Sequence, residues 1–193
     1  MQQVHVLHAA NYNRNDEAFL FPVKFNRRRL LDHGVDVRFC SRITPSLMEC
    51  DVLCLSSRFF RPWWAKVEGA EILEFLQKAR REGVRTLWCD VSDGTGTTHF
   101  KVLPYVDKYL KNQVLKDRSL YQKIYYGSRI TTDFYHRHFG VQDTDPGEPH
   151  LNHIPDSEDL EKLGVGWHFG MTHHGRHGSL WARLRHEIGV VPY

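Results

Sequence analysis

Residues 65–99 read AKVEGAEILEFLQKARREGVRTLWCDVSDGTGTTH, and this stretch indicates the fold class. Apolar residues recur at helical spacing over Ala65–Glu82, and Gly83 follows as a residue that ends a helix. Val84–Cys89 is a short apolar run, which predicts a buried strand. A helix that passes through one glycine into a buried strand is a unit of a parallel sheet wrapped by helices.

The residues before this stretch repeat the same alternation. Short apolar runs predict three further strands, and Gly34 ends a helix between the first two of them; the strands are Val4–His8, Val35–Cys40 and Asp51–Leu55, and the helix is Phe19–His33. We therefore predict an α/β fold, a Rossmann-like parallel sheet with helices on both faces. In such sheets ligands bind at the carboxyl ends of the strands, so the functional edge should hold the loops after His8, Leu55 and Cys89.

The pattern weakens after residue 97. A fifth strand is expected near Val106–Leu110, residues 140–159 are a loop by composition, and one helix is expected at Gly178–His186. We divide the chain into a Rossmann-like domain, residues 1–140, and a loop-rich C-terminal extension, residues 141–193. The end of this extension would fit the start of an interdomain linker.

Composition narrows the class of protein. The 193 residues are 41% hydrophobic and 25% charged, and 26 basic residues against 23 acidic ones give a net charge of +3. This balance argues against a nucleic-acid partner. No apolar run reaches the roughly 18 residues of a transmembrane helix, and the N-terminus lacks a signal peptide, so we expect a cytoplasmic protein. The four cysteines (Cys40, Cys50, Cys54 and Cys89) lie in or beside apolar runs, which favours buried reduced thiols.

The loop after the first strand is polar and lies where a substrate would bind. Its candidate substrate-binding residues are Asn11, Tyr12, Asn13 and Arg14. It lacks the G-x-G-x-x-G turn of dinucleotide sites, so we predict no bound nicotinamide or flavin cofactor. The alternative is a connecting loop whose Asn and Asp residues cap the next helix.

The loop after the fourth strand carries more chemistry. A carboxylate or imidazole there is suited to general-base work, and glycines let backbone amides approach an anion or a sugar. We predict Asp90, Asp93 and His99 as catalytic residues, and as substrate-binding residues Ser92, Gly94, Thr95, Gly96 and Thr97. The alternative is a turn that needs glycine for its backbone angles and uses Asp and Thr as caps.

Two other groups of residues are candidates for binding: a basic and aromatic stretch and a histidine cluster. Basic and aromatic residues interleave from Lys108 to Arg137, a pattern suited to phosphate, carbohydrate or single-stranded nucleic acid, and from it we take Lys111 and Arg118 as substrate-binding residues. A solvated helix face is the alternative. Histidines cluster near the C-terminus (His168, His173, His174 and His177), but glycines between them argue against a helical metal site, so we predict no metal.

Several segments resemble bacterial and viral polysaccharide-biosynthesis glycosyltransferases of the GT-B type. The similarity covers about residues 85–175 and is carried by Asp90–Thr98, Leu103–Gln113, Lys116–Tyr121, Thr132–Tyr135 and Val165–Met171, with His168 where the family usually has Asn. The resemblance implies an acceptor-side, N-terminal domain, transfer from a nucleotide-sugar co-substrate to a glycan or lipid-linked acceptor, and no bound metal. It also implies a C-terminal donor-binding domain, which this chain does not match, and leaves peripheral association with the inner membrane face open.

From this resemblance we expect a glycosyltransferase-like protein in which Asp90, Asp93 or His99 deprotonates the acceptor. The main alternative is a non-catalytic Rossmann-like module that binds a glycan or a nucleotide. A nucleic-acid protein and a small nucleotide-dependent hydrolase or oxidoreductase fit the residues less well.

Overall fold

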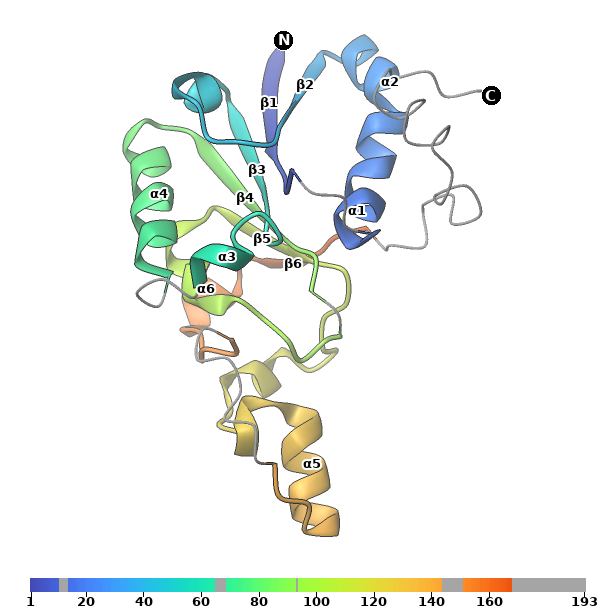
Figure 1. The fold of residues 1–193 in the computed structure, drawn as a ribbon, viewed down its shortest axis with the longest axis vertical. Helices are drawn as coiled ribbons and strands as arrows, with labels where there is room; N and C mark the ends of the chain where they lie inside the picture. The colour runs from blue at the N-terminus through green and yellow to red at the C-terminus, as the bar shows by residue number, and fades with distance from the viewer. Residues whose placement is uncertain (11–13, 65–68, 93, 144–150, 168–193) are drawn as a thin grey trace.

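The computed structural model describes residues 1–10, 14–64, 69–92, 94–143 and 151–167, and these residues build one parallel sheet (Figure 1). The order along the sheet is β2-β1-β3-β4-β5-β6, and every neighbouring pair is parallel. The strands are β1 (Gln2–Leu7), β2 (Val35–Cys40), β3 (Val52–Ser56), β4 (Arg85–Asp90), β5 (Lys108–Lys111) and β6 (Leu163–Val165). The predicted Rossmann-like α/β fold is confirmed.

Helices cover both faces of this sheet, because its buried strands turn apolar side chains alternately to each side. Val6 packs with Phe19 and Leu20 of α1 (Arg14–Phe25) in one core. Its neighbour Leu7 belongs to a second core with residues of α3 (Arg61–Trp64), α4 (Ala70–Arg81) and α6 (Ser157–Leu160). Figure 1 shows α1 and α2 (Arg27–Asp32) on one side of the sheet and α4 on the other.

Two helices differ from the sequence prediction. The expected helix Phe19–His33 begins earlier and is divided at Asn26, whose side-chain amide and backbone N–H both donate to the carbonyl of Pro22, at 2.8 and 3.1 Å. The expected helix Ala65–Glu82 is described from Ala70 and ends at Arg81. Gly83 follows with φ +75°, as expected of a residue that ends a helix.

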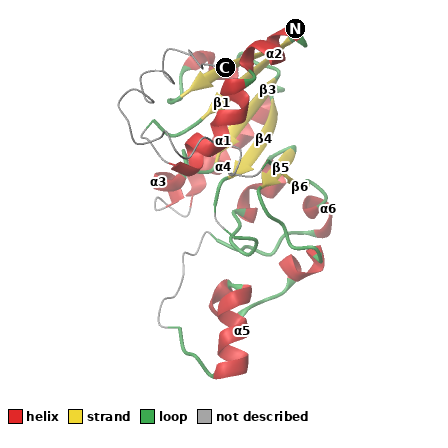
Figure 2. Cartoon of the chain, turned by 90° about the vertical axis from the view of Figure 1, so that its right-hand side faces the viewer, coloured by secondary structure: helices red, strands yellow, loops and turns green. Residues whose placement is uncertain are grey.

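A long segment, residues 112–162, connects β5 to β6, and we call it the excursion. It contains the short 3₁₀ helices η4 (Arg118–Gln122) and η5 (Tyr126–Ser128), and α5 (Ile130–Phe139), which projects away from the sheet in Figures 1 and 2. The segment between β4 and β5 contains η3 (Phe100–Tyr105), and η1 (Pro45–Met48) precedes β3.

The sheet includes residues beyond the expected domain boundary at 140. Its last strand, β6, pairs with β5 and lies in the segment that we assigned to the loop-rich extension. Beyond β6, the ring of Trp167 stacks on Phe19 with centroids 5.0 Å apart, and its Nε1 donates to the Phe19 carbonyl at 2.9 Å. The chain thus returns from β6 to the face covered by α1. The helix expected at 178–186 lies outside the described residues.

The strand order places the reversal of winding between β1 and β3. Order 2-1-3-4-5 is that of flavodoxin-like doubly wound sheets, in which ligands bind beyond the carboxyl ends of the strands at this reversal. The described helices include none that is long and apolar enough to cross a membrane.

Candidate functional site

The register of β4 and β5 places Asp90 directly beside Lys111 at the carboxyl end of both strands. Nζ of Lys111 lies 3.3 Å from Oδ2 of Asp90, and it also donates to the carbonyl and hydroxyl oxygens of Ser92 at 3.2 and 3.0 Å. Tyr109 lies two residues before Lys111, on the same face of β5, and its hydroxyl donates to Oδ2 of Asp90 at 2.5 Å. Ser92 donates to Oδ1 of Asp90 from its hydroxyl at 2.5 Å and from its backbone at 2.9 Å.

His99 completes this group, which we call the Asp90 cluster (Asp90, Ser92, His99, Tyr109 and Lys111). Nδ1 of His99 lies 3.4 Å from Oδ1 of Asp90, and the backbone N–H of His99 donates to the Tyr109 hydroxyl at 2.9 Å. The loop that joins Ser92 to His99 thus returns to the strand end where it began. Four of the residues predicted at the site are brought together in this way: Asp90, Ser92, His99 and Lys111.

The electrostatics of the cluster keep Asp90 ionised. Burial by itself raises the pKa of this carboxyl, but His99, Lys111 and the Ser92 hydrogen bonds outweigh burial and hold the pKa well below its usual range. Burial, followed by the charge of Asp90, raises the pKa of Tyr109 well above its ordinary value, so the phenol remains a donor. Asp90 is therefore a fixed negative charge that its neighbours satisfy.

The imidazole of His99 is less enclosed than the side chains of Asp90 and Lys111. The side chains of Asp90 and Lys111 have no exposed area, whereas that of His99 is 11% exposed. The imidazole stacks on Trp64 of α3, with centroids 5.5 Å apart and planes 19° from parallel. The 3.4 Å contact of Nδ1 with Asp90 is electrostatic rather than a hydrogen bond, so the orientation of the ring comes mainly from its stacking on Trp64.

A second polar group lies at the reversal between β1 and β3. Asp16, in the first turn of α1, accepts hydrogen bonds from the backbone N–H of Ala9 at 2.8 Å and from the Ser56 hydroxyl. Burial raises the pKa of Asp16, and the Ser56 and Ala9 hydrogen bonds and the charges of His8 and Arg58 offset only part of this effect.

The two groups are joined by the ends of β3 and β4. Ser57 follows β3, and its hydroxyl accepts a hydrogen bond from the backbone N–H of Val91 at 3.1 Å. The backbone N–H of Ser57 donates to the Cys89 carbonyl at 2.9 Å. Hydrogen bonds between the ends of β3 and β4 thus connect the Asp16 group with the Asp90 cluster.

Other predicted site residues have separate places. Asn11, Tyr12, Asn13 and Asp93 lie outside the described residues, and Arg14 begins α1. The Arg118 guanidinium donates to the Leu163 carbonyl at 2.8 Å and so ties η4 to β6. Lys111 is enclosed with Asp90, so in this structure it balances a buried charge rather than facing a ligand.

The glycine-containing part of the loop contributes mainly through its backbone. The Thr95 carbonyl accepts from the Tyr121 hydroxyl at 2.8 Å, and the Thr97 carbonyl accepts from the Ser92 hydroxyl at 3.1 Å. Gly94 has φ +75°, the conformation that the turn interpretation anticipates, and Gly96 lines a small pocket.

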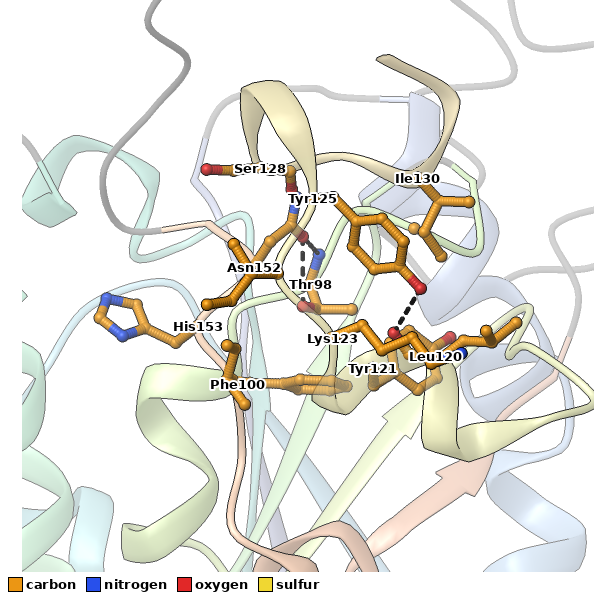
Figure 3. A pocket seen from close by; sticks show the side chains of 13 residues that line it. Thr98, Phe100, Leu120, Tyr121, Lys123, Tyr125, Ser128, Ile130, Asn152 and His153 are labelled. Atoms are coloured by element: carbon orange, nitrogen blue, oxygen red, sulfur yellow. Dashed lines mark hydrogen bonds between the residues drawn. The ribbon is translucent and has the colours of Figure 1, made fainter. Parts of the chain in front are cut away.

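This pocket lies between the loop after β4 and the excursion (Figure 3). Its volume is about 140 Å³, and its lining includes three aromatic side chains, Phe100, Tyr121 and Tyr125. The basic and aromatic residues from Lys108 to Arg137 do not form one helix face, because they belong to several elements. They are distributed over β5, η4, η5 and α5, with Tyr109 and Tyr121 buried and Phe134 and Tyr135 exposed on α5.

Sequence reasoning missed Asp16, Ser56 and Tyr109. Asp16 and Ser56 are 40 residues apart, and the available signal was that each borders a strand or helix end at the predicted edge. Tyr109 carried a weaker signal, namely a tyrosine on a strand two residues before a lysine on the same face.

All four cysteines are free thiols, as the sequence predicts, but only Cys89 is buried, and Cys40, Cys50 and Cys54 are partly exposed. Burial, with a smaller contribution from Cys50, raises the pKa of Cys54 to about 12, and burial raises that of Cys89 well above its ordinary value. Across the described ranges, no three His, Cys, Asp or Glu side chains are grouped as metal ligands. The histidines at 168, 173, 174 and 177 lie outside those ranges, so the predicted absence of a metal there stays a prediction.

Comparison of the chain with protein-family models, with curated proteins and with solved structures found no match.

Proposed function

We propose that the chain is the acceptor-side domain of a glycosyltransferase, in which His99 accepts the proton of an acceptor hydroxyl. The observation that carries the proposal is the Asp90–His99 pair at the carboxyl end of β4, where Nδ1 of His99 lies 3.4 Å from the buried carboxylate. The resemblance to GT-B polysaccharide-biosynthesis enzymes supports the class of reaction, and the Rossmann-like sheet is compatible with it.

The proposed step divides the work between the two residues. With its Nδ1 facing Asp90, His99 takes the acceptor proton on Nε2 as the acceptor oxygen bonds to the anomeric carbon of the donor sugar. The bond from that carbon to the diphosphate breaks, and the nucleoside diphosphate leaves with the electron pair. Asp90 stays ionised and stabilises the imidazolium, which later returns its proton to solvent.

The donor is expected to bind outside this sheet. The loop after β1 carries no glycine-rich turn for a diphosphate, and the family resemblance implies a second domain for the nucleotide sugar. This domain would come from another part of a longer chain or from a partner. Nucleotide sugar is therefore a co-substrate here, and the acceptor is a glycan or a lipid-linked glycan.

The test is release of nucleoside diphosphate from a panel of nucleotide sugars in the presence of mixed oligosaccharide acceptors. One arm uses the purified chain, and a second adds clarified extract of the source cells to supply a separate donor-binding domain. We expect release in one arm, lowered about 100-fold or more by His99→Gln. The matched control His33→Gln, at the exposed end of α2, should leave release unchanged.

The alternative is a non-catalytic module that binds a glycan or a nucleotide on the same sheet. It is favoured by the near-complete enclosure of the Asp90 cluster, which also suits a purely structural role. Glycan binding without any His99-dependent release in either arm would support this module and contradict the transferase.

A further inference from the structure

The pocket between the loop after β4 and the excursion has the features of a built binding site. Its floor consists of Phe100 and Tyr121, Tyr125 forms a wall, and Lys123, Ser128 and His153 lie around it (Figure 3). None of these residues belongs to the Asp90 cluster, although Thr98, which also lines the pocket, directly precedes His99.

The aromatic floor is fixed in place. The Tyr121 hydroxyl donates to the Thr95 carbonyl at 2.8 Å and accepts from the Leu115 backbone at 2.9 Å. Its ring meets Phe100 edge to face, with centroids 5.1 Å apart and planes at 77°. Because the hydroxyl of Tyr121 is already engaged, its ring is the part that can contact a ligand, as a single aromatic face rather than a slot between two parallel rings.

Two other residues that line the pocket have an unfavourable backbone conformation. Among the described residues, the two non-glycine residues with positive φ are Ser128 at +56° and Asn152 at +57°, and both line this pocket. Asn152 connects them, since its side chain donates to the Ser128 carbonyl at 2.6 Å and accepts from the Thr98 backbone at 2.8 Å. Left-handed residues other than glycine concentrate at ligand sites, where the surrounding structure maintains them.

The remaining polar groups favour an anion. In the part of the chain that the structure describes, the Lys123 ammonium, the His153 ring and the Ser128 hydroxyl make no hydrogen bond or ion pair. Asp117 is the neighbouring carboxylate: two hydrogen bonds from Ser119 to its Oδ1 lower its pKa, and the charge of Lys123 adds a smaller effect in the same direction. The pocket therefore offers one ammonium, that of Lys123, beside an aromatic face, and in Figure 3 the side chains of Ser128 and His153 point away from that face.

The volume limits the enclosed part of a ligand to about one ring. An engineered apolar cavity of about 150 Å³ holds a benzene molecule, and this pocket measures about 140 Å³. We propose that the pocket binds a single six-membered sugar ring carrying a carboxylate or phosphate group, with the apolar face of the sugar on Tyr121 and the anion at Lys123. The proposal depends on the proposed function only in treating this sugar as part of the acceptor.

The test is a binding titration of the whole chain with D-glucuronate and glucose 6-phosphate as probes, and with glucose, inorganic phosphate and adenosine monophosphate for comparison. Methyl resonances of Ile124 and Ile130, which line the pocket, report the location, and that of Ile43 is the remote control. We expect one or both acidic sugars to shift the pocket methyls and to bind more tightly than glucose or phosphate. Lys123→Gln should weaken that binding about fivefold, the scale of an exposed ion pair, and Lys116→Gln should not change it.

Each other result overturns the proposal in a distinct way. Equal affinity for inorganic phosphate would reduce the pocket to an anion site, and tighter binding of adenosine monophosphate would make it a nucleotide site. No shift at Ile124 and Ile130 with either acidic sugar, or unchanged affinity in Lys123→Gln, would show that the pocket is not an acidic-sugar site. These outcomes are separate from the transferase assay, because sugar binding here requires neither His99 nor a donor.

Discussion

Nζ of Lys111 lies 3.3 Å from Oδ2 of Asp90, and neither side chain has any exposed surface. A fully buried ion pair gives little net stability relative to a well-packed apolar pair, but breaking it by removing one partner is costly. The additional hydrogen bonds from Ser92 and Tyr109 use the remaining acceptor capacity of the carboxylate. The pair therefore fixes the carboxyl ends of β4 and β5, from which the loop carrying His99 departs.

The first prediction concerns this pair. Asp90→Asn should lower the free energy of unfolding at neutral pH by about 3–5 kcal/mol, because it leaves the Lys111 ammonium buried without a counter-charge. The double variant Asp90→Asn/Lys111→Met removes both charges and should lose less stability than the two single variants together. Urea denaturation of the four proteins measures this coupling, and strictly additive losses would contradict it.

The second prediction concerns the pH dependence due to Asp16, whose pKa is raised by burial. Between the unfolded pKa of about 3.9 and the higher folded pKa, the folded state binds more protons than the unfolded state, so stability falls as pH rises. Asp16→Asn lacks this loss, and its stability relative to wild type should improve with pH across that window.

Denaturation curves across the acidic to neutral range check this prediction. Ser56→Ala removes a hydrogen bond that lowers the folded pKa of Asp16, so it should extend the upper limit of this window to higher pH. A stability difference between Asp16→Asn and wild type that stays constant with pH would show that the carboxyl is not perturbed.

The third prediction tests the support beneath His99. Gly69 has φ +77°, and a Cβ there would lie 2.5 Å from Cε3 of Trp64, the residue on which His99 stacks. Gly83 has nearly the same φ, +75°, but nothing lies within 4 Å of its position for a Cβ. Gly83→Ala should cost about 1–2 kcal/mol through backbone strain alone.

Gly69→Ala should cost about 1–3 kcal/mol more than Gly83→Ala, through the clash with Trp64. It should also move the His99 imidazole resonances, which Gly83→Ala should leave in place. Equal stability losses in the two variants, with His99 undisturbed, would mean that Trp64 does not hold the imidazole.

Local sequence patterns predicted most of the sheet. Continuous apolar runs such as Asp51–Leu55 and the glycines at 34 and 83 located the first four strands and the helix ends between them, because buried strands and left-handed turns leave strong local signals. β6 was missed because a three-residue strand with Gly164 at its centre carries no periodicity. The division at Asn26 was missed because one residue outside helical geometry, with φ −96° and ψ 12°, leaves no mark on the apolar pattern.

The site was partly predictable for a topological reason. Asp90, His99 and Lys111 follow or end predicted strands, and parallel strands bring their carboxyl ends to one edge. Their burial was not predictable, since Lys111 resembles a surface lysine until its register with Asp90 is known. The contact of Asp16 with Ser56 joins residues distant in sequence and becomes visible only when α1 packs over the reversal between β1 and β3.

The proposed role of His99 as a proton acceptor requires Nδ1 to carry its proton toward Asp90, and the tautomer of His99 tests this directly. A long-range ¹H–¹⁵N spectrum in mildly alkaline buffer, assigned by comparison with His99→Gln, distinguishes the two ring nitrogens. We predict the proton on Nδ1, facing Oδ1 of Asp90 at 3.4 Å, and an unprotonated Nε2. A proton on Nε2 would contradict the account, because that nitrogen could not then take a proton from an acceptor hydroxyl.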